Sequence, residues 1–155
     1  MNRKTSAYIS LVICIVCAVV LVALLFTFPM VFKWLLELSG VVQKNYADTV
    51  KALSIAFYAA SPFSLTAVCL LIKLLLNVIH DKVFVDPNVK YLRIISYCCY
   101  AVALICTVYV FASRPLVKSI ALVGLAMVLV GTLLRVVKNV MQSAVELREE
   151  NDLTI

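Results

Sequence analysis

Charged residues are scarce in this sequence of 155 residues. They make up 14% of the chain, whereas hydrophobic residues make up 65%. A soluble domain of this length would carry roughly 25% charged residues. Long apolar runs with so little charge need lipid as their solvent, which excludes an ordinary soluble protein and predicts an integral membrane protein. The length leaves no room for a second domain, so we expect one transmembrane domain over residues 1–155.

Acidic residues and histidine are missing from the apolar runs. No Asp or Glu lies within a predicted span, and the one histidine, His80, stands beside Asp81 at the end of a span. A His–Asp pair can act as a base and its orienting group, but no nucleophile is placed near this one, and such a pair is more often a solvated turn. We therefore expect a protein that is not an enzyme and that carries no cofactor.

The six cysteines do not indicate a metal or redox site. All of them lie inside apolar runs, and the CxxC pair formed by Cys14 and Cys17 has no histidine or acidic residue nearby. Zinc binding and redox chemistry need deprotonated sulfur, which hydrocarbon disfavours. We expect the cysteines to be small apolar packing residues, and we predict no metal site.

Four apolar runs are long enough to cross a bilayer. The first, residues 8–32, has 25 uncharged residues. At about 1.5 Å per residue it spans roughly 37 Å, against a hydrocarbon core of roughly 30 Å. The other spans are expected near 52–79, 91–112 and 116–141. This pattern predicts an all-α, antiparallel up-down four-helix bundle, with a short interfacial helix in the first loop.

Local signals add detail to three of these helices. Pro62 lacks a backbone donor and predicts a kink in the second span. Asp86, followed directly by a proline, is a capping pattern that predicts the start of the third helix. In the fourth span, Gly124 and Gly131 are seven residues apart, and Ala121 lies near the same face. Small residues in such a stripe predict close packing between helices.

The basic residues indicate how the protein sits in its membrane. The net charge is +6, but the fourteen Lys and Arg are scattered over helix ends and loops, so we expect no direct nucleic-acid binding. With the N-terminus inside, the inner segments hold eight basic residues and the outer loops five. This predicts a multi-pass protein of the bacterial cytoplasmic membrane with both termini in the cytoplasm. The eight are Arg3, Lys4, Lys82, Lys90, Arg93, Arg135, Lys138 and Arg148; the five are Lys33, Lys44, Lys51, Arg114 and Lys118.

The segment 142–155 is the acidic exception in this basic chain. Four of the eight acidic residues fall in the last ten positions, together with one arginine. Apolar residues at helical spacing continue through Leu147, which predicts that the fourth helix extends to about Glu150. Anionic lipid repels such a segment, so we expect it to project into the cytoplasm as an acidic tail.

Two stretches, VFVDPNVKYLRII and AVELREENDLTI, resemble a family of small bacterial membrane proteins, domain of unknown function 2975, also described as YoaS-like. The resemblance covers essentially the whole chain. It implies four spans with a cytoplasmic middle loop, and no established enzyme activity. Proteins of this kind are often encoded next to a very small Cro/C1-type helix-turn-helix protein. The resemblance therefore implies a regulatory protein that binds or sequesters this transcription regulator.

We expect the middle loop and the tail to form one cytoplasmic surface for such a partner. An acidic segment can meet the basic face of a DNA-binding protein by charge complementarity, and the apolar residues at its end can anchor in a groove. The residues expected to bind the partner are Phe84, Asn88, Lys90, Arg93, Glu146, Glu149, Glu150, Asp152, Leu153 and Ile155.

Three alternatives stay open at this point. The chain could instead be a small transporter, channel or immunity protein, because four such helices can form a pore as a homo-oligomer and Pro62 supplies a helix break. The tail could be a solvated end that frays. Finally, the similar stretches 71–79 and 133–141 indicate either a duplicated hairpin or two independent helix ends.

Overall fold

The computed structural model describes residues 3–38, 46–80, 83, 85–112 and 117–152. These residues form four helices, which are α1 (Arg3–Leu38), α2 (Tyr46–Ile79), α3 (Asp86–Ala112) and α4 (Val117–Asp152). Each helix contains a segment that is long and apolar enough to cross a membrane. The prediction of an all-α, multi-pass membrane protein with four spans is therefore confirmed.

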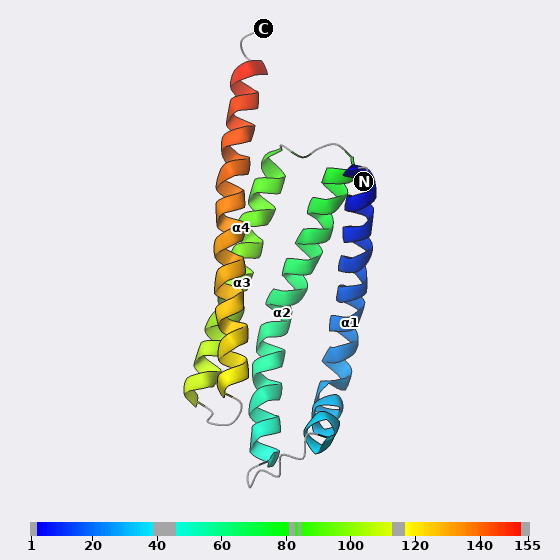
Figure 1. Ribbon diagram of the computed structural model, residues 1–155, viewed down its shortest axis with the longest axis vertical. Coiled ribbons are helices and arrows are strands. Elements are labelled where there is room, and N and C mark those ends of the chain that lie inside the picture. The colour runs from blue at the N-terminus through cyan, green and yellow to red at the C-terminus, as the bar shows by residue number, and fades with distance from the viewer. Residues whose placement is uncertain (1–2, 39–45, 81–82, 84, 113–116, 153–155) are drawn as a thin grey trace.

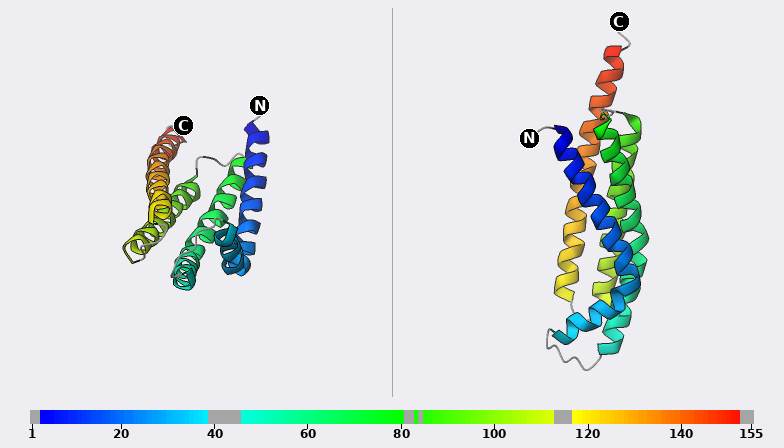
Figure 2. Two further views of the ribbon diagram at one scale, coloured as in Figure 1. Left: turned by 60° about the horizontal axis from the view of Figure 1, so that its bottom comes forward. Right: turned by 90° about the vertical axis from the view of Figure 1, so that its right-hand side faces the viewer.

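Two helix ends match their sequence signals, and one differs. The cap-and-proline pattern predicts a helix start at Asp86, where α3 begins. The helical spacing of the tail predicts a helix to about Glu150, and α4 ends at Asp152. The expected interfacial helix in the first loop is helical but not separate, because α1 runs continuously to Leu38. Its last turns are set at an angle to the rest of α1 (Figure 2).

The four helices lie side by side in chain order (Figure 1). Among the described residues, α1 contacts α2, α2 contacts α3 and α3 contacts α4, whereas helices that are not neighbours in the sequence make no contact. The bundle is therefore an open row of two hairpins, α1–α2 and α3–α4, with α1 and α4 at its edges. In a bilayer both faces of such a row are available to lipid.

Both ends of the chain lie at the same end of the row, which we call the terminal end (Figure 1). The last turns of α4 extend past the other three helices there, in the views of both Figure 1 and Figure 2. That this end faces the cytoplasm stays a prediction from the distribution of Lys and Arg.

Burial is concentrated in α3. In the most apolar 18-residue segment of α3, a third of the residues are buried. The corresponding share is 11% in α4 and zero in α1 and α2. Lipid solvates apolar side chains as well as a protein core does, so burial here reflects close packing rather than avoidance of water. The buried hydrophobic residues of α3 are Val89, Leu92, Ile95, Cys98, Ala103 and Tyr109, and its buried polar residues are Asn88 and Ser96. The other helices contribute Ala7, Val50 and Val145.

The first hairpin pairs two helices that each contain a proline. Pro29 lies inside α1 and Pro62 inside α2, which continues through it without a break. A proline has no N–H for the carbonyl four residues before it, here Leu25 and Tyr58. The Tyr58 hydroxyl donates to the Leu25 carbonyl at 3.0 Å, and the Ser61 hydroxyl donates to the Tyr58 carbonyl at 2.8 Å. Hydroxyl groups therefore replace both missing donors, and one of these bonds joins α1 to α2.

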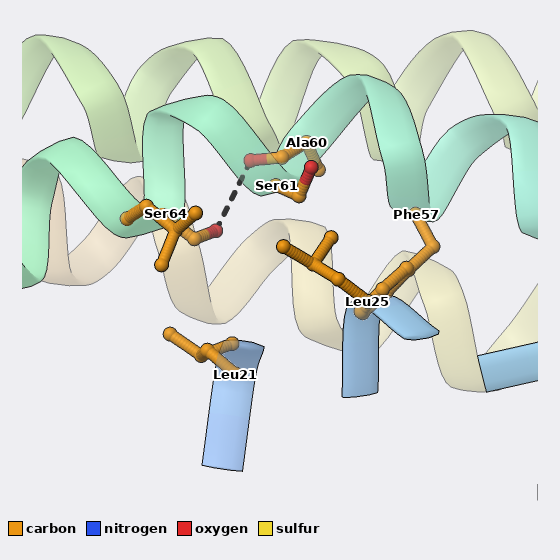
Figure 3. A pocket seen from close by; sticks show the side chains of 7 residues that line it. Leu21, Leu25, Phe57, Ala60, Ser61 and Ser64 are labelled. Atoms are coloured by element: carbon orange, nitrogen blue, oxygen red, sulfur yellow. Dashed lines mark hydrogen bonds between the residues drawn. The ribbon is translucent and has the colours of Figure 1, made fainter. Parts of the chain in front are cut away.

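Aromatic rings support the same contact. The Phe28 and Phe57 rings stack across α1 and α2 with centroids 4.0 Å apart and planes inclined by 5°. Next to them is a cavity of about 40 Å³, lined by side chains of both helices (Figure 3). The Ser64 hydroxyl beside it donates to the Ala60 carbonyl of its own helix at 3.2 Å. This volume suits roughly one or two waters and no larger solute.

Candidate functional site where α3 and α4 leave the membrane

Glycine residues of α4 bring it close to α3. Both Gly124 and Gly131 are buried. A Cβ on Gly131 would lie 3.0 Å from Cε1 of Tyr100 and 3.3 Å from Cβ of Cys99, and a Cβ on Gly124 would lie 3.2 Å from Cβ of Cys106. A larger residue at either position would require these neighbours to shift, so glycine permits the close approach of the helices. The two glycines are seven residues apart, and so are the two cysteines. In the antiparallel pair, Gly131 therefore faces Cys99 and Gly124 faces Cys106.

Two further residues define the limits of this contact. Ala121, which the sequence analysis places near the glycine stripe, is exposed. It stands three residues before Gly124, about one turn nearer the start of α4, where its side chain is not covered. Deeper in the contact, the hydroxyls of Tyr100 and Thr132 lie 3.3 Å apart, and that of Thr132 donates to the Val128 carbonyl at 2.8 Å. Tyr100 is therefore the donor between the helices.

A buried polar junction fixes the start of α3 against the end of α2. Asn88 is fully buried. Its side-chain oxygen accepts from the Asn77 amide of α2 at 2.7 Å, and its own amide donates to the Val83 carbonyl at 2.8 Å. Buried polar groups need such partners, because hydrocarbon offers none. Asn88 thus ties α2, the connection and α3 together, and a partner that docks without opening this junction cannot touch its side chain.

Charged residues from both parts of the predicted binding surface meet beside this junction. A cavity of about 270 Å³ lies between α3 and α4, and we call it the mixed-charge cavity. The structure therefore brings the start of α3 and the base of the tail together. The cavity is lined by Asp86, Val89, Lys90 and Arg93 of α3 and by Gln142, Val145 and Glu146 of α4.

A second cavity, the basic cleft, lies next to the first and shares Arg93 with it. It has a volume of about 200 Å³ and is lined by Arg93, Ser96 and Tyr97 of α3 and by Arg135 and Lys138 of α4. From the sequence, Arg93, Arg135 and Lys138 are expected only to lie on the same side of the membrane, and no local pattern places them in one cleft. The spacings of Arg93 to Tyr97 and of Arg135 to Lys138 each place two polar residues on one helix face. Only the helix pairing, however, joins these faces.

The outer part of α4 presents charged and apolar side chains together. Glu146, Leu147 and Glu150 are exposed, with Leu147 at 62% of its surface. Gln142 donates from its amide to the Glu146 carboxylate one turn away, at 3.0 Å. Of the other predicted partner-binding residues, Phe84, Leu153 and Ile155 lie outside the described residues, as do the side chains of Glu149 and Asp152. The binding role of the whole set stays a prediction.

No metal site accompanies these features within the described part of the chain, where no three His, Cys, Asp or Glu side chains gather. Cys14 and Cys17, the CxxC pair, are half-buried and exposed on α1. Cys99 and Cys106 instead form the surface on which the α4 glycines pack. For these two cysteines the geometry is that of small packing residues.

The comparison with known families agrees with the resemblance found in the sequence. The sequence model described as "Protein of unknown function (DUF2975)" matches residues 4–155, and the chain belongs to this family. No curated protein and no solved structure matches the chain.

Proposed function

We propose that this DUF2975 protein is a non-enzymatic regulatory protein of the membrane. In this proposal the open row of helices is the anchor. The surface where α3 and α4 leave the membrane binds, and can sequester, a small cytoplasmic helix-turn-helix regulator. The observation that carries the proposal is where α4 ends: it continues as one helix to Asp152, past the ends of the other three helices. A helix needed only to cross the bilayer has no use for these additional turns.

The charges on this extension suit a DNA-binding partner. A protein that binds DNA carries Lys and Arg on the face that meets the phosphates. Glu146 and Glu150 lie one turn apart on the exposed part of α4, and Glu149 and Asp152 add two more carboxylates to the same stretch of sequence. An acidic helix can cover the basic face of such a protein, and occupation of this face would compete with DNA.

The extension also offers an apolar anchor. The Leu147 side chain is 62% exposed, and it lies next to Arg148, the last residue of the candidate membrane span. Binding energy at protein interfaces is concentrated in a few apolar or aromatic residues surrounded by polar ones. Leu147 between Glu146 and Glu150 has this arrangement, in a helix that can lie in a groove of the partner.

Co-purification with a small Cro/C1-type helix-turn-helix protein, the partner that the family resemblance implies, tests this proposal. We expect the full chain, extracted from membranes in mild detergent, to retain the regulator. A variant that lacks residues 146–155 should lose it. Equal recovery with both chains would contradict the role of the tail.

Two variants of the intact chain make the test specific. Glu146→Lys with Glu150→Lys should abolish recovery if charge complementarity drives binding. Lys51→Glu changes an exposed residue near the beginning of α2, at the opposite end of the row, and should leave recovery unchanged. A loss of the regulator with Lys51→Glu would indicate a non-specific charge effect.

Transport or an immunity function is the second candidate, and the paired prolines of the first hairpin favour it. Transporters often break helices near the substrate site, and prolines are found at such breaks, although α2 continues through Pro62 here. The cavity beside Pro62 has only about 40 Å³, and so it would have to widen in another conformation. Solute flux into proteoliposomes that decreases in Tyr58→Phe would support transport, whereas the absence of flux would favour the regulatory role.

A further inference from the structure

The basic cleft shares Arg93 with the residues expected to bind the regulator, but its other two cations, Arg135 and Lys138, are not among those residues. Three cationic side chains from two helices, Arg93, Arg135 and Lys138, face one space of about 200 Å³, and none of the described residues that line it is acidic. The Lys138 ammonium group is held by the Asn139 side-chain oxygen at 2.9 Å. Cations gathered in this way repel one another, so an anion in the cleft would stabilise the arrangement.

The position of the cleft along the helices suits a lipid headgroup. Arg93 lies 19 residues before the end of α3 at Ala112, and Arg135 lies 18 residues after the start of α4 at Val117. At about 1.5 Å per residue these distances are roughly 29 and 27 Å, close to the thickness of roughly 30 Å of the hydrocarbon core. If the opposite ends of α3 and α4 lie at one membrane surface, both arginines lie at the other.

The surroundings of the cleft agree with this position. Close in sequence to its lining residues, Ile94, Leu133 and Val136 are 42%, 65% and 56% exposed. Exposed aliphatic side chains next to a charged pocket between two helices can hold an acyl chain while the pocket holds the headgroup. A soluble anion would have no use for these apolar residues.

We propose that the basic cleft binds the phosphate of an anionic phospholipid headgroup. The planar guanidinium groups of Arg93 and Arg135 each have paired donors for phosphate oxygens. Lys138 adds a point charge, and Tyr97 lines the same space. The buried Ser96 hydroxyl donates to the Arg93 carbonyl at 2.8 Å, so its proton is not available for a hydrogen bond to the phosphate. A net negative headgroup is preferred over a zwitterionic one, because a choline group would bring a fourth positive charge to three cations.

Native mass spectrometry of the purified full chain, with lipid added in increasing amounts, tests this assignment. Phosphatidylglycerol and phosphatidylcholine of equal chain length are compared, and inorganic phosphate is added as a competitor. We expect phosphatidylglycerol to bind at least roughly tenfold more tightly than phosphatidylcholine, and millimolar phosphate not to displace it. Displacement by phosphate would overturn the lipid assignment in favour of a soluble phosphate, and equal binding of the two lipids would overturn the site altogether.

Substitutions locate the site. Arg135→Gln and Arg93→Gln, from the two walls of the cleft, should each lower the affinity for phosphatidylglycerol roughly tenfold, which is typical for the loss of a hydrogen bond to a charged group. Arg135→Lys keeps the charge and should recover part of this loss. Lys73→Gln removes an exposed cation from α2, outside the cleft. It should change the affinity less than twofold, because exposed charges away from a site contribute little to binding. Equal affinities in Arg135→Gln and Lys73→Gln would contradict the proposal.

Discussion

The two hairpins of this protein are held together by different means. In α1–α2 the contact consists of stacked phenylalanine rings and a tyrosine hydroxyl that reaches a carbonyl freed by Pro29. In α3–α4 two glycines allow the backbones to approach so closely that a methyl group would meet Tyr100 at 3.0 Å. The hairpin with the more hydrophobic helix, α1, is the less buried one. Hydropathy therefore does not determine which membrane helices pack tightly, because lipid solvates an apolar surface as well as another helix does. Small residues and hydrogen bonds determine it instead.

The close packing of the second hairpin also places the polar chemistry. Because α4 stays close to α3, the residues about one to four turns beyond the glycine contact face each other across two cavities. One of them contains carboxylates and cations, and the other contains cations and hydroxyls. Both depend on the helix pairing, so a change that separates α3 from α4 should disturb them together.

Gly131→Leu should have the largest effect on the second hairpin. The new side chain would overlap the Tyr100 ring and the Cys99 side chain, and overpacking of this kind costs about 1–3 kcal/mol or more. Reversible unfolding by sodium dodecyl sulfate in mixed micelles measures the loss. Ala121→Leu introduces the same side chain on the exposed side of α4 and should cost little. Equal losses in both variants would show that α4 does not pack on α3 through its glycines.

Asn88→Ala should weaken the joint between the two hairpins. The substitution removes the hydrogen bonds that the Asn77 amide and the Val83 carbonyl make with the Asn88 side chain. We expect the free energy of unfolding, measured in the same assay, to fall by about 1–3 kcal/mol. The matched control is Asn139→Ala, which removes an exposed asparagine of α4. If the control destabilises as much as Asn88→Ala, the buried junction has no special role.

Tyr58→Phe should have the smallest effect, confined to the first hairpin. It removes the hydroxyl that donates to the Leu25 carbonyl, worth about 0.5–1.5 kcal/mol. Pro29→Ala restores a backbone N–H for this carbonyl, and so Tyr58→Phe should cost less in that background. A double-mutant cycle on the free energy of unfolding measures the difference. Additive effects would mean that the tyrosine does not replace the missing donor.

Sequence periodicity and hydropathy predict the parts of this fold that depend on local signals. The four spans follow from long uncharged runs, the start of α3 from Asp86 and the following proline, and the helical tail from the spacing that continues to Glu150. In each case the physical cause lies within one turn or one run of the chain. Residues 33–38 differ because α1 accommodates Pro29 and continues to Leu38, so the expected interfacial helix joins α1.

The features that depend on contacts between helices are harder to predict. Arg93 and Arg135 are 42 positions apart in the sequence, and nothing local indicates that they share a cleft. The bond between Tyr58 and Leu25 likewise requires the pairing of α1 with α2. The seven-residue spacing of Cys99 and Cys106 was available as a signal, since it equals that of the α4 glycines.

Site-specific photo-crosslinking in cells that produce the helix-turn-helix protein tests the proposed function most directly. A photoreactive amino acid replaces either Leu147, on the tail of the second hairpin, or Tyr8, which is 54% exposed near the terminal end of the first. We predict an adduct with the regulator from position 147 and none from position 8. Absence of the adduct from position 147, or equal adducts from both positions, would contradict the assignment of the binding surface to the exit of α3 and α4.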